Sequence, residues 1–245
     1  MWYNGKNEEG KNMFDLRSIV MGTVLMLKKY TFINITIYEE ANKDDYINGI
    51  YVLPLIGFAV GFIALLLSSL KIFYDDLFVS AIILTYYHII TKTVNMKETY
   101  RTLNYYIKPG NQTEQLSGLI GIILINLMYF SLFRVVTPTA LVVMTVVGFS
   151  SPIILSAVIK RDKGNTSILK YCNKNHIIAA FAISFLIAAL INYRLVISLS
   201  LTYMISGMII SLLDEKIKVF PSSVEGAIIE ITQVLFLVIT YLMKL

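Results

Sequence analysis

Long apolar runs, separated by short connections that hold most of the charges, dominate this chain of 245 residues. Residues 49–70 contain no charged side chain. Because a helix rises 1.5 Å per residue, a run of about 20 apolar residues crosses the hydrocarbon core of a bilayer. Runs of similar quality lie at 116–133, 138–158, 177–192, 195–213 and 226–243, and a weaker one lies at 77–90. Backbone groups in hydrocarbon must pair within their own segment, so the pattern predicts an all-α, polytopic membrane bundle of about seven transmembrane helices.

The first 48 residues follow a different pattern. Residues 18–27 are apolar but too short to cross upright, and no small-residue cleavage site follows them, so they predict a short interfacial or re-entrant helix. Residues 31–38 alternate apolar and polar positions, which is typical of a short surface strand or an extended linker. We expect one membrane domain over 1–245, made of an N-terminal cytoplasmic or interfacial segment (1–48) and a transmembrane bundle (49–245).

Composition and charge support a membrane location. Apolar residues make up 56% of the chain and charged residues only 15%, which leaves too little polar surface for a water-soluble globule of this size. With seven spans, 17 of the 21 Lys and Arg residues fall on one side. The other side holds Lys71, Arg134, Arg194 and Lys244. Because positive residues stay in the cytoplasm, we expect the N-terminus and the long loops inside and the C-terminus outside.

Two connections on the predicted cytoplasmic side, 91–115 and 159–176, carry several cations each. Some of these cations lie close to predicted helix ends, where phosphates are well held. The alternative is that the net charge of +5 serves topology and contact with anionic lipid head groups. Nucleic acid is not an expected partner, since the basic residues form no stripe with interleaved stacking aromatics. The cations in question are Lys92, Lys97, Arg101, Lys160 and Arg161.

Few ionisable groups lie at membrane depth, where they are costly. His88 stands near the end of the second run, either as a hydrogen-bonded interface residue or as a ligand-binding group. Glu230 lies within the last run and needs a partner, so both a functional role and a structural hydrogen bond are open. Asp75 and Asp76 fit a solvated turn better than a metal site. The single cysteine, Cys172, excludes an intramolecular disulfide.

Two short motifs resemble the cobalamin synthase family, the adenosylcobinamide-GDP ribazoletransferases. Residues 39–61, EEANKDDYINGIYVLPLIGFAVG, are similar to the entry into that family's first span, with Pro54 and Gly57 in the diagnostic places. Near the C-terminus the family pattern G-D-T-x-G-A-x-x-E is matched in SSVEGAIIEI by Gly226, Ala227 and Glu230. Length and hydropathy order agree as well, so the resemblance covers essentially the whole chain.

The resemblance implies a late step of adenosylcobalamin synthesis in the bacterial cytoplasmic (inner) membrane. There, α-ribazole or its 5′-phosphate is joined to adenosylcobinamide-GDP and GMP is released, with Mg²⁺ as the cofactor. A homo-oligomer or other membrane enzymes of cobalamin synthesis are the partners to expect besides lipid and the nucleotide-linked corrinoid. The candidate substrate-binding residues are His88, Lys92, Lys97, Arg101, Lys160, Arg161 and Glu230.

This chain departs from the family pattern at the residues that the resemblance implies as metal ligands. The family's acidic run D-G-x-A-D-T-x-D-G is missing, and the equivalent stretch HIITKTVNMKETYRTLNYYIK keeps only its His88. The family aspartate of the C-terminal motif falls on Ser223, and an expected arginine falls near Ser151. Mg²⁺ prefers hard carboxylate oxygens, and only Glu98 and Glu230 are left as weak candidates. The resemblance therefore implies Mg²⁺, while the residues supply few ligands for it.

Three functions remain open from the sequence. The first is the transferase itself, with the metal held by other residues. The second is a catalytically silent relative that binds a corrinoid or a nucleotide-linked intermediate, or that scaffolds membrane enzymes. The third is a small transporter, which the shortage of charged or helix-breaking residues in mid-span and the lack of internal repeats disfavour. Metal dependence of ligand binding separates the first from the other two.

Overall fold

A computed structural model of the chain shows a helical bundle in which the described residues form no strand. Among the described residues, six helices are long and apolar enough to cross a membrane, or seven if the bent pair α4 (Asp76–Ile90) and α5 (Val94–Tyr106) counts as one span. The predicted all-α polytopic membrane fold is thus confirmed, and its spans contact lipid. The structure describes residues 16–36, 40–106, 114–159, 167–216 and 220–245.

The first span is a continuous helical run rather than a single α-helix. It begins six residues before the apolar stretch, with the short polar helix α2 (Lys43–Gly49) and a 3₁₀ turn, η1 (Ile50–Val52), and it ends in a second such turn, η2 (Ser69–Ile72). Its long part is α3 (Leu53–Ser68). The other spanning helices are α6 (Glu114–Val135), α7 (Pro138–Leu155), α9 (Lys174–Asn192), α10 (Leu195–Lys216) and α11 (Val224–Leu242), and a five-residue helix, α8 (Ser167–Tyr171), precedes α9.

Helix α7 is the centre of the bundle, since every residue from Ala140 to Leu155 is buried. Helix α3 packs against it through two glycines one turn apart, Gly57 and Gly61. A Cβ atom on Gly57 would lie 2.6 Å from the carbonyl oxygen of Thr145 in α7. Small residues at this spacing let two membrane helices approach to backbone contact. Pro54 lies in the first turn of α3, where its missing N–H costs no hydrogen bond.

The N-terminal segment contains the expected helix. Helix α1 (Leu16–Tyr30) includes residues 18–27 and buries one residue per turn along one face, from Ser18 to Tyr30. Gly22 on this face touches the backbone of Gly49 at the end of α2. Of the alternating stretch 31–38, the described part forms neither helix nor strand, which favours the linker; residues 37–39 lie outside the described residues.

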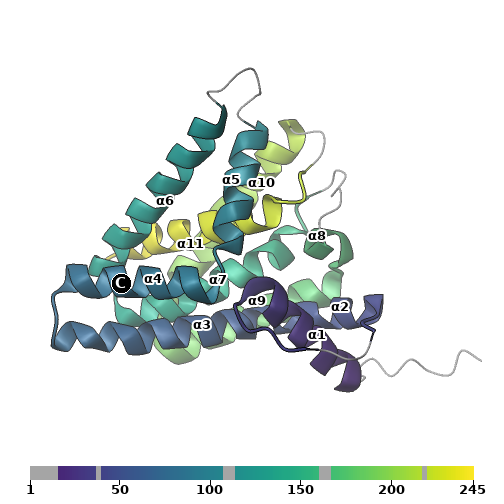
Figure 1. Cartoon of the computed structure of the whole chain (residues 1–245), viewed down its shortest axis with the longest axis horizontal. Helices are drawn as coiled ribbons and strands as arrows, with labels where there is room; N and C mark the ends of the chain where they lie inside the picture. Colours follow the sequence, from purple (N-terminus) through teal and green to yellow (C-terminus); the bar gives the residue numbers. More distant parts are fainter. Residues whose placement is uncertain (1–15, 37–39, 107–113, 160–166, 217–219) are drawn as a thin grey trace, which may run out of the picture.

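A sharp turn between α4 and α5 redirects the chain by 83°. Helices α3 and α4 lie alongside each other, and α5 stands across them (Figure 1). The turn contains Lys92 and Thr93, with φ angles of 50° and 53°. Two successive non-glycine residues in the left-handed region are strained, and the strain is greatest for β-branched threonine. The turn therefore fixes the direction of α5 at a cost in stability.

We expect Thr93→Gly to stabilise the protein by about 1 kcal/mol, because glycine adopts a positive φ without steric penalty. Denaturant titration of the detergent-solubilised protein measures the change. Thr93→Ala is the matched control, since it removes the Thr93 hydroxyl, which donates to the Lys92 carbonyl, but keeps the strained backbone. Equal unfolding of the glycine and alanine variants would contradict a backbone origin.

Among the described residues, Lys71 and Arg134 lie at one end of the bundle, and Lys92, Lys97 and Arg101 lie toward the other. Lys71 Nζ donates to the carbonyls of Phe133 and Arg134, so these two connections meet at one end. Asp75 is exposed and caps α4 by accepting from the N–H groups of Leu77 and Phe78, which supports the solvated turn. The α4–α5 turn lies at the opposite end. Which end faces the cytoplasm stays a prediction.

Candidate functional site

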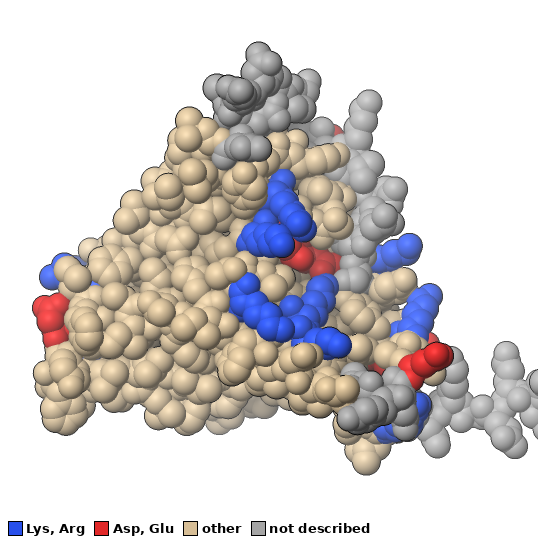
Figure 2. Space-filling model, viewed as in Figure 1, with Lys and Arg blue, Asp and Glu red and all other residues tan. Residues whose placement is uncertain are grey.

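Basic side chains gather over α5, the α4–α5 turn and the neighbouring end of α1, around a few acidic atoms (Figure 2). Lys92 lies in the turn, and Lys97 and Arg101 follow one helical turn apart on the same face of α5. All three side chains are exposed, as is Lys28 near the end of α1. We call Lys92, Lys97 and Arg101 the basic face. A surface of this kind attracts phosphate groups.

Glu225, in the first turn of α11, is the buried counterpart of the basic face. Its side chain is only 2% exposed. Its Oε2 atom accepts from Lys29 Nζ at 3.0 Å and from the Tyr30 hydroxyl at 3.3 Å. Its Oε1 atom accepts from the backbone N–H groups of Ile168 and Leu169 at 2.6 and 3.3 Å. Four donors therefore surround this carboxylate, and it ties α1 and α8 to α11.

The charge of Glu225 shifts the pKa values of its neighbours in α1. Burial lowers the pKa of the Lys29 ammonium, but the Glu225 carboxylate and Tyr46 outweigh burial, so that the pKa lies above its ordinary value. Burial and the same carboxylate raise the pKa of the Tyr30 hydroxyl well above its ordinary value. Lys29 therefore stays charged and Tyr30 neutral around neutral pH.

Glu98 meets α11 at the glycine of the C-terminal motif. The Gly226 N–H donates to Glu98 Oε2 at 2.9 Å. A Cβ atom on Gly226 would lie 2.5 Å from the Glu98 Cβ and 2.9 Å from the Asn95 carbonyl, so only glycine allows this approach. Glu98 also interacts electrostatically with Lys29, Glu225 and Arg101. Two positions singled out by the sequence, Glu98 and Gly226, thus come together beside Glu225.

Ser223, which stands where the family has an aspartate, forms a hydrogen bond within the bundle. Its hydroxyl lies 2.8 Å from that of Thr102 in α5. Ser151, near the expected arginine, donates to Thr232 at 2.8 Å. Both serines are buried. Neutral hydrogen bonds between helices therefore occupy two places where the resemblance implies charged groups.

Glu230 lies deeper in α11 than Glu225 and has different partners. Its side chain is 0% exposed and accepts from the hydroxyls of Tyr87 in α4 and Tyr129 in α6, at 2.9 and 2.7 Å. Both hydroxyls also lie within 2.8 Å of Gln233 Oε1. This network joins α4, α6 and α11 inside the bundle. The structural hydrogen bond considered from the sequence is therefore present, and a contact between Glu230 and a ligand stays a prediction.

The remaining predicted residues do not join the basic face. His88 points to α6, where its Nε2 lies 2.6 Å from Asn126 Oδ1, so the hydrogen-bonded interface considered from the sequence is present. Lys160 and Arg161 lie outside the described residues, and their role stays a prediction. Of the seven candidate substrate-binding residues, the structure places Lys92, Lys97 and Arg101 on one surface.

Three residues outside the seven sequence-based candidates brace this surface from within: Lys29, Tyr30 and Glu225. A usable signal was present, because a carboxylate in the first turn of an apolar span requires a cation or several donors. The identity of the partner is a long-range contact, however, since Lys29 and Glu225 are 196 positions apart.

The donor set does not fit a Mg²⁺ site. Within the described ranges, no three His, Cys, Asp or Glu side chains are grouped so as to hold a metal ion. The Glu225 carboxylate is taken up by Lys29 and three further donors, and the Glu230 carboxylate by two tyrosines. Mg²⁺ needs several oxygen ligands in near-octahedral positions. Glu98 alone, among the weak candidates, lies beside the basic face.

The fold defines a polytopic α-helical membrane protein, and exposed basic side chains gather at one end of its bundle. Over 235 residues the chain is 22% identical to the adenosylcobinamide-GDP ribazoletransferase of Alkaliphilus oremlandii (strain OhILAs). That alignment covers 90% of this chain and 97% of the relative. No family model and no solved structure match the chain. The similarity extends over most of the chain, but at this identity it does not establish a family or a reaction.

Proposed function

We propose that this chain is a divergent relative of the adenosylcobinamide-GDP ribazoletransferases that binds a nucleotide-linked, diphosphate-bearing ligand on its basic face. Such a ligand places its phosphates at a membrane surface, where Lys92, Lys97 and Arg101 supply ammonium and guanidinium donors. The similarity to a ribazoletransferase over most of both chains supports a corrinoid carrying GDP as the ligand class.

The observation that carries the proposal is the way the basic face is held. Exposed lysines on a membrane protein also attract lipid head groups, so charge alone does not indicate a ligand site. Here α5 is turned across the bundle by a strained corner and fixed to α11 through Glu98 and Gly226. The adjacent carboxylate of Glu225 is neutralised by Lys29 rather than left to repel phosphate. Strain and buried charge at one place are typical of a functional site.

In the transfer that the resemblance implies, Mg²⁺ offsets the charge that accumulates on the phosphate. The described residues do not provide the ligands for it, and the basic face alone would bind and orient the diphosphate. This favours the ligand-binding, catalytically silent or slow relative over an efficient transferase. Metal-independent binding of the ligand is the property that separates the two.

We expect Arg101→Ala to weaken binding of adenosylcobinamide-GDP by about 1 to 3 kcal/mol, the usual loss when a charge-assisted hydrogen bond is removed. Isothermal titration calorimetry on the detergent-solubilised protein measures this. Arg161→Ala is expected to act in the same way if its loop joins the basic face. Arg134→Ala is the matched control, because Arg134 is an exposed arginine at the other end of the bundle.

The titration is run with Mg²⁺ and again with EDTA. Equal affinity for adenosylcobinamide-GDP in both supports binding that does not depend on a metal ion. If Arg101→Ala and Arg134→Ala bind the ligand equally well, the basic face serves the lipid surface and the proposal fails.

A further inference from the structure

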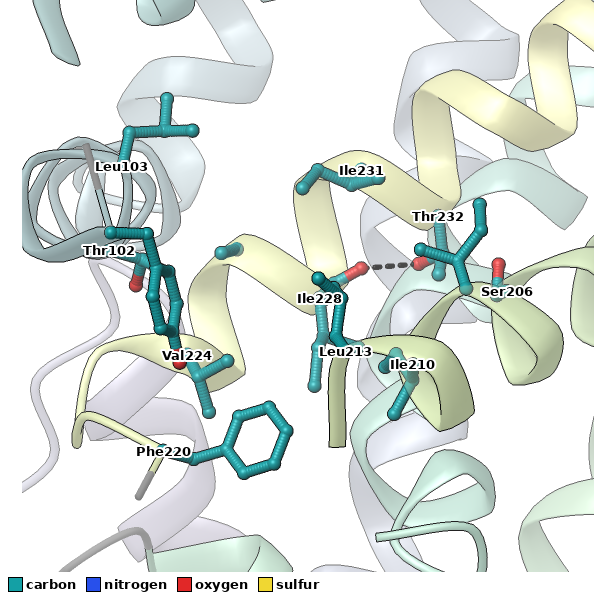
Figure 3. Close-up of a pocket in the computed structure, with 13 residues that line it drawn as sticks. Thr102, Leu103, Ser206, Ile210, Leu213, Phe220, Val224, Ile228, Ile231 and Thr232 are labelled. Atoms are coloured by element: carbon teal, nitrogen blue, oxygen red, sulfur yellow. Dashed lines mark hydrogen bonds between the residues drawn. The ribbon is translucent and has the colours of Figure 1, made fainter. Parts of the chain in front are cut away.

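A cavity of about 200 Å³ lies between α5, α10 and the start of α11 (Figure 3). Its wall is almost entirely hydrocarbon. Leu103, Ile210, Phe220, Val224 and Ile228 project into it from three helices and the connection before α11. Cavities with apolar walls such as this accept apolar ligands.

The cavity opens toward the lipid. Three of its lining residues, Ile209, Leu213 and Ile231, are 44%, 42% and 46% exposed. On α10 they continue into the exposed side chains of Met208 and Leu212. Because α10 and α11 are membrane-spanning helices, these apolar side chains face acyl chains rather than water. The cavity is thus a recess in the lipid-facing surface.

From these observations we propose that the cavity is a binding site for one acyl chain of a membrane phospholipid. The chain enters between α5 and α10 and fills the space beside Phe220. This site is separate from the basic face and does not depend on the proposed function. It makes the packing of α5, which carries the basic face, sensitive to the surrounding lipid.

Quenching of tryptophan fluorescence by lipid brominated on its acyl chains tests the site, because bromine quenches only at close range. The native tryptophan is replaced (Trp2→Phe), and Phe220→Trp places a reporter on the inner wall of the cavity. Phe236→Trp is the matched control, since both phenylalanines are buried but Phe236 does not line the cavity. In vesicles of brominated phosphatidylcholine we expect at least a twofold loss of emission for Phe220→Trp and little loss for Phe236→Trp.

Filling the cavity provides the second arm of the experiment. Ala227→Leu from α11, or Ser206→Leu from α10, occupies the space that the chain would take. Either substitution is expected to reduce quenching of the Phe220→Trp reporter to the level of the control, and two substitutions on different helices guard against one that misfolds. Equal quenching of both reporters, or quenching that the folded filled variants retain, would overturn the proposal. Calorimetry measures separately whether the filled variants still bind the nucleotide-linked ligand, and so tests the basic face independently of the cavity.

Discussion

Purified protein supplied with adenosylcobinamide-GDP, α-ribazole phosphate and Mg²⁺ is expected to turn over on the order of 10³-fold more slowly than a relative that keeps the acidic run. The acidic run is absent here, Ser223 stands in place of an aspartate, and the carboxylates that remain near the basic face are Glu98 and Glu225. Without several carboxylate ligands the charge that develops on the phosphate is offset only by ammonium and guanidinium groups. Quantifying GMP release by chromatography measures the rate.

The control is the acidic-run relative, purified in the same detergent and assayed with the same substrates. Transplanting its acidic loop in place of the α4–α5 turn should raise the rate only if Glu98, Gly226 and Glu230 remain in register. Turnover at the relative's level by the unmodified chain would show that other carboxylates hold the metal, with Glu98 and Glu230 the first to test.

Removing Lys29, the cation that pairs with the buried Glu225, is expected to have the largest effect on stability. Lys29→Met should lower the free energy of unfolding by about 3 kcal/mol, because it leaves the Glu225 carboxylate buried without its counter-charge. The remaining donors, the Tyr30 hydroxyl and two backbone N–H groups, are neutral and offset only part of the loss. Denaturant titration in detergent, followed by circular dichroism, measures the change.

Lys28→Met is the matched control, since Lys28 is the adjacent lysine and is exposed; we expect it to change stability by less than about 0.5 kcal/mol. Adding Glu225→Gln to Lys29→Met should recover much of the loss, because the uncompensated charge is then gone. If Lys29→Met and Lys28→Met unfold identically, the ion pair between Lys29 and Glu225 contributes nothing to stability.

The spans were predictable because the bilayer imposes a local rule. A run such as 138–158 must be helical to satisfy its own backbone, whatever surrounds it, and α7 occupies most of that run. The helix over 18–27 was predictable for a related reason, since its apolar residues form a continuous stretch. The 83° corner after α4 was not predictable from the sequence. A glycine would have indicated a positive φ there, but the positions are occupied by Lys92 and Thr93.

By itself, the sequence determined the fold class, the separation of charge between the two ends, and the basic residues of α5, because each follows from local composition and spacing. Only the tertiary structure decided which charges are paired. Glu225 and Glu230 lie five positions apart on one helix, yet one faces Lys29 and the other faces two tyrosines. Helix phase and packing against α1, α4 and α6 set that difference. Contacts between residues far apart in the chain depend on how whole helices pack, and local sequence patterns do not specify that packing.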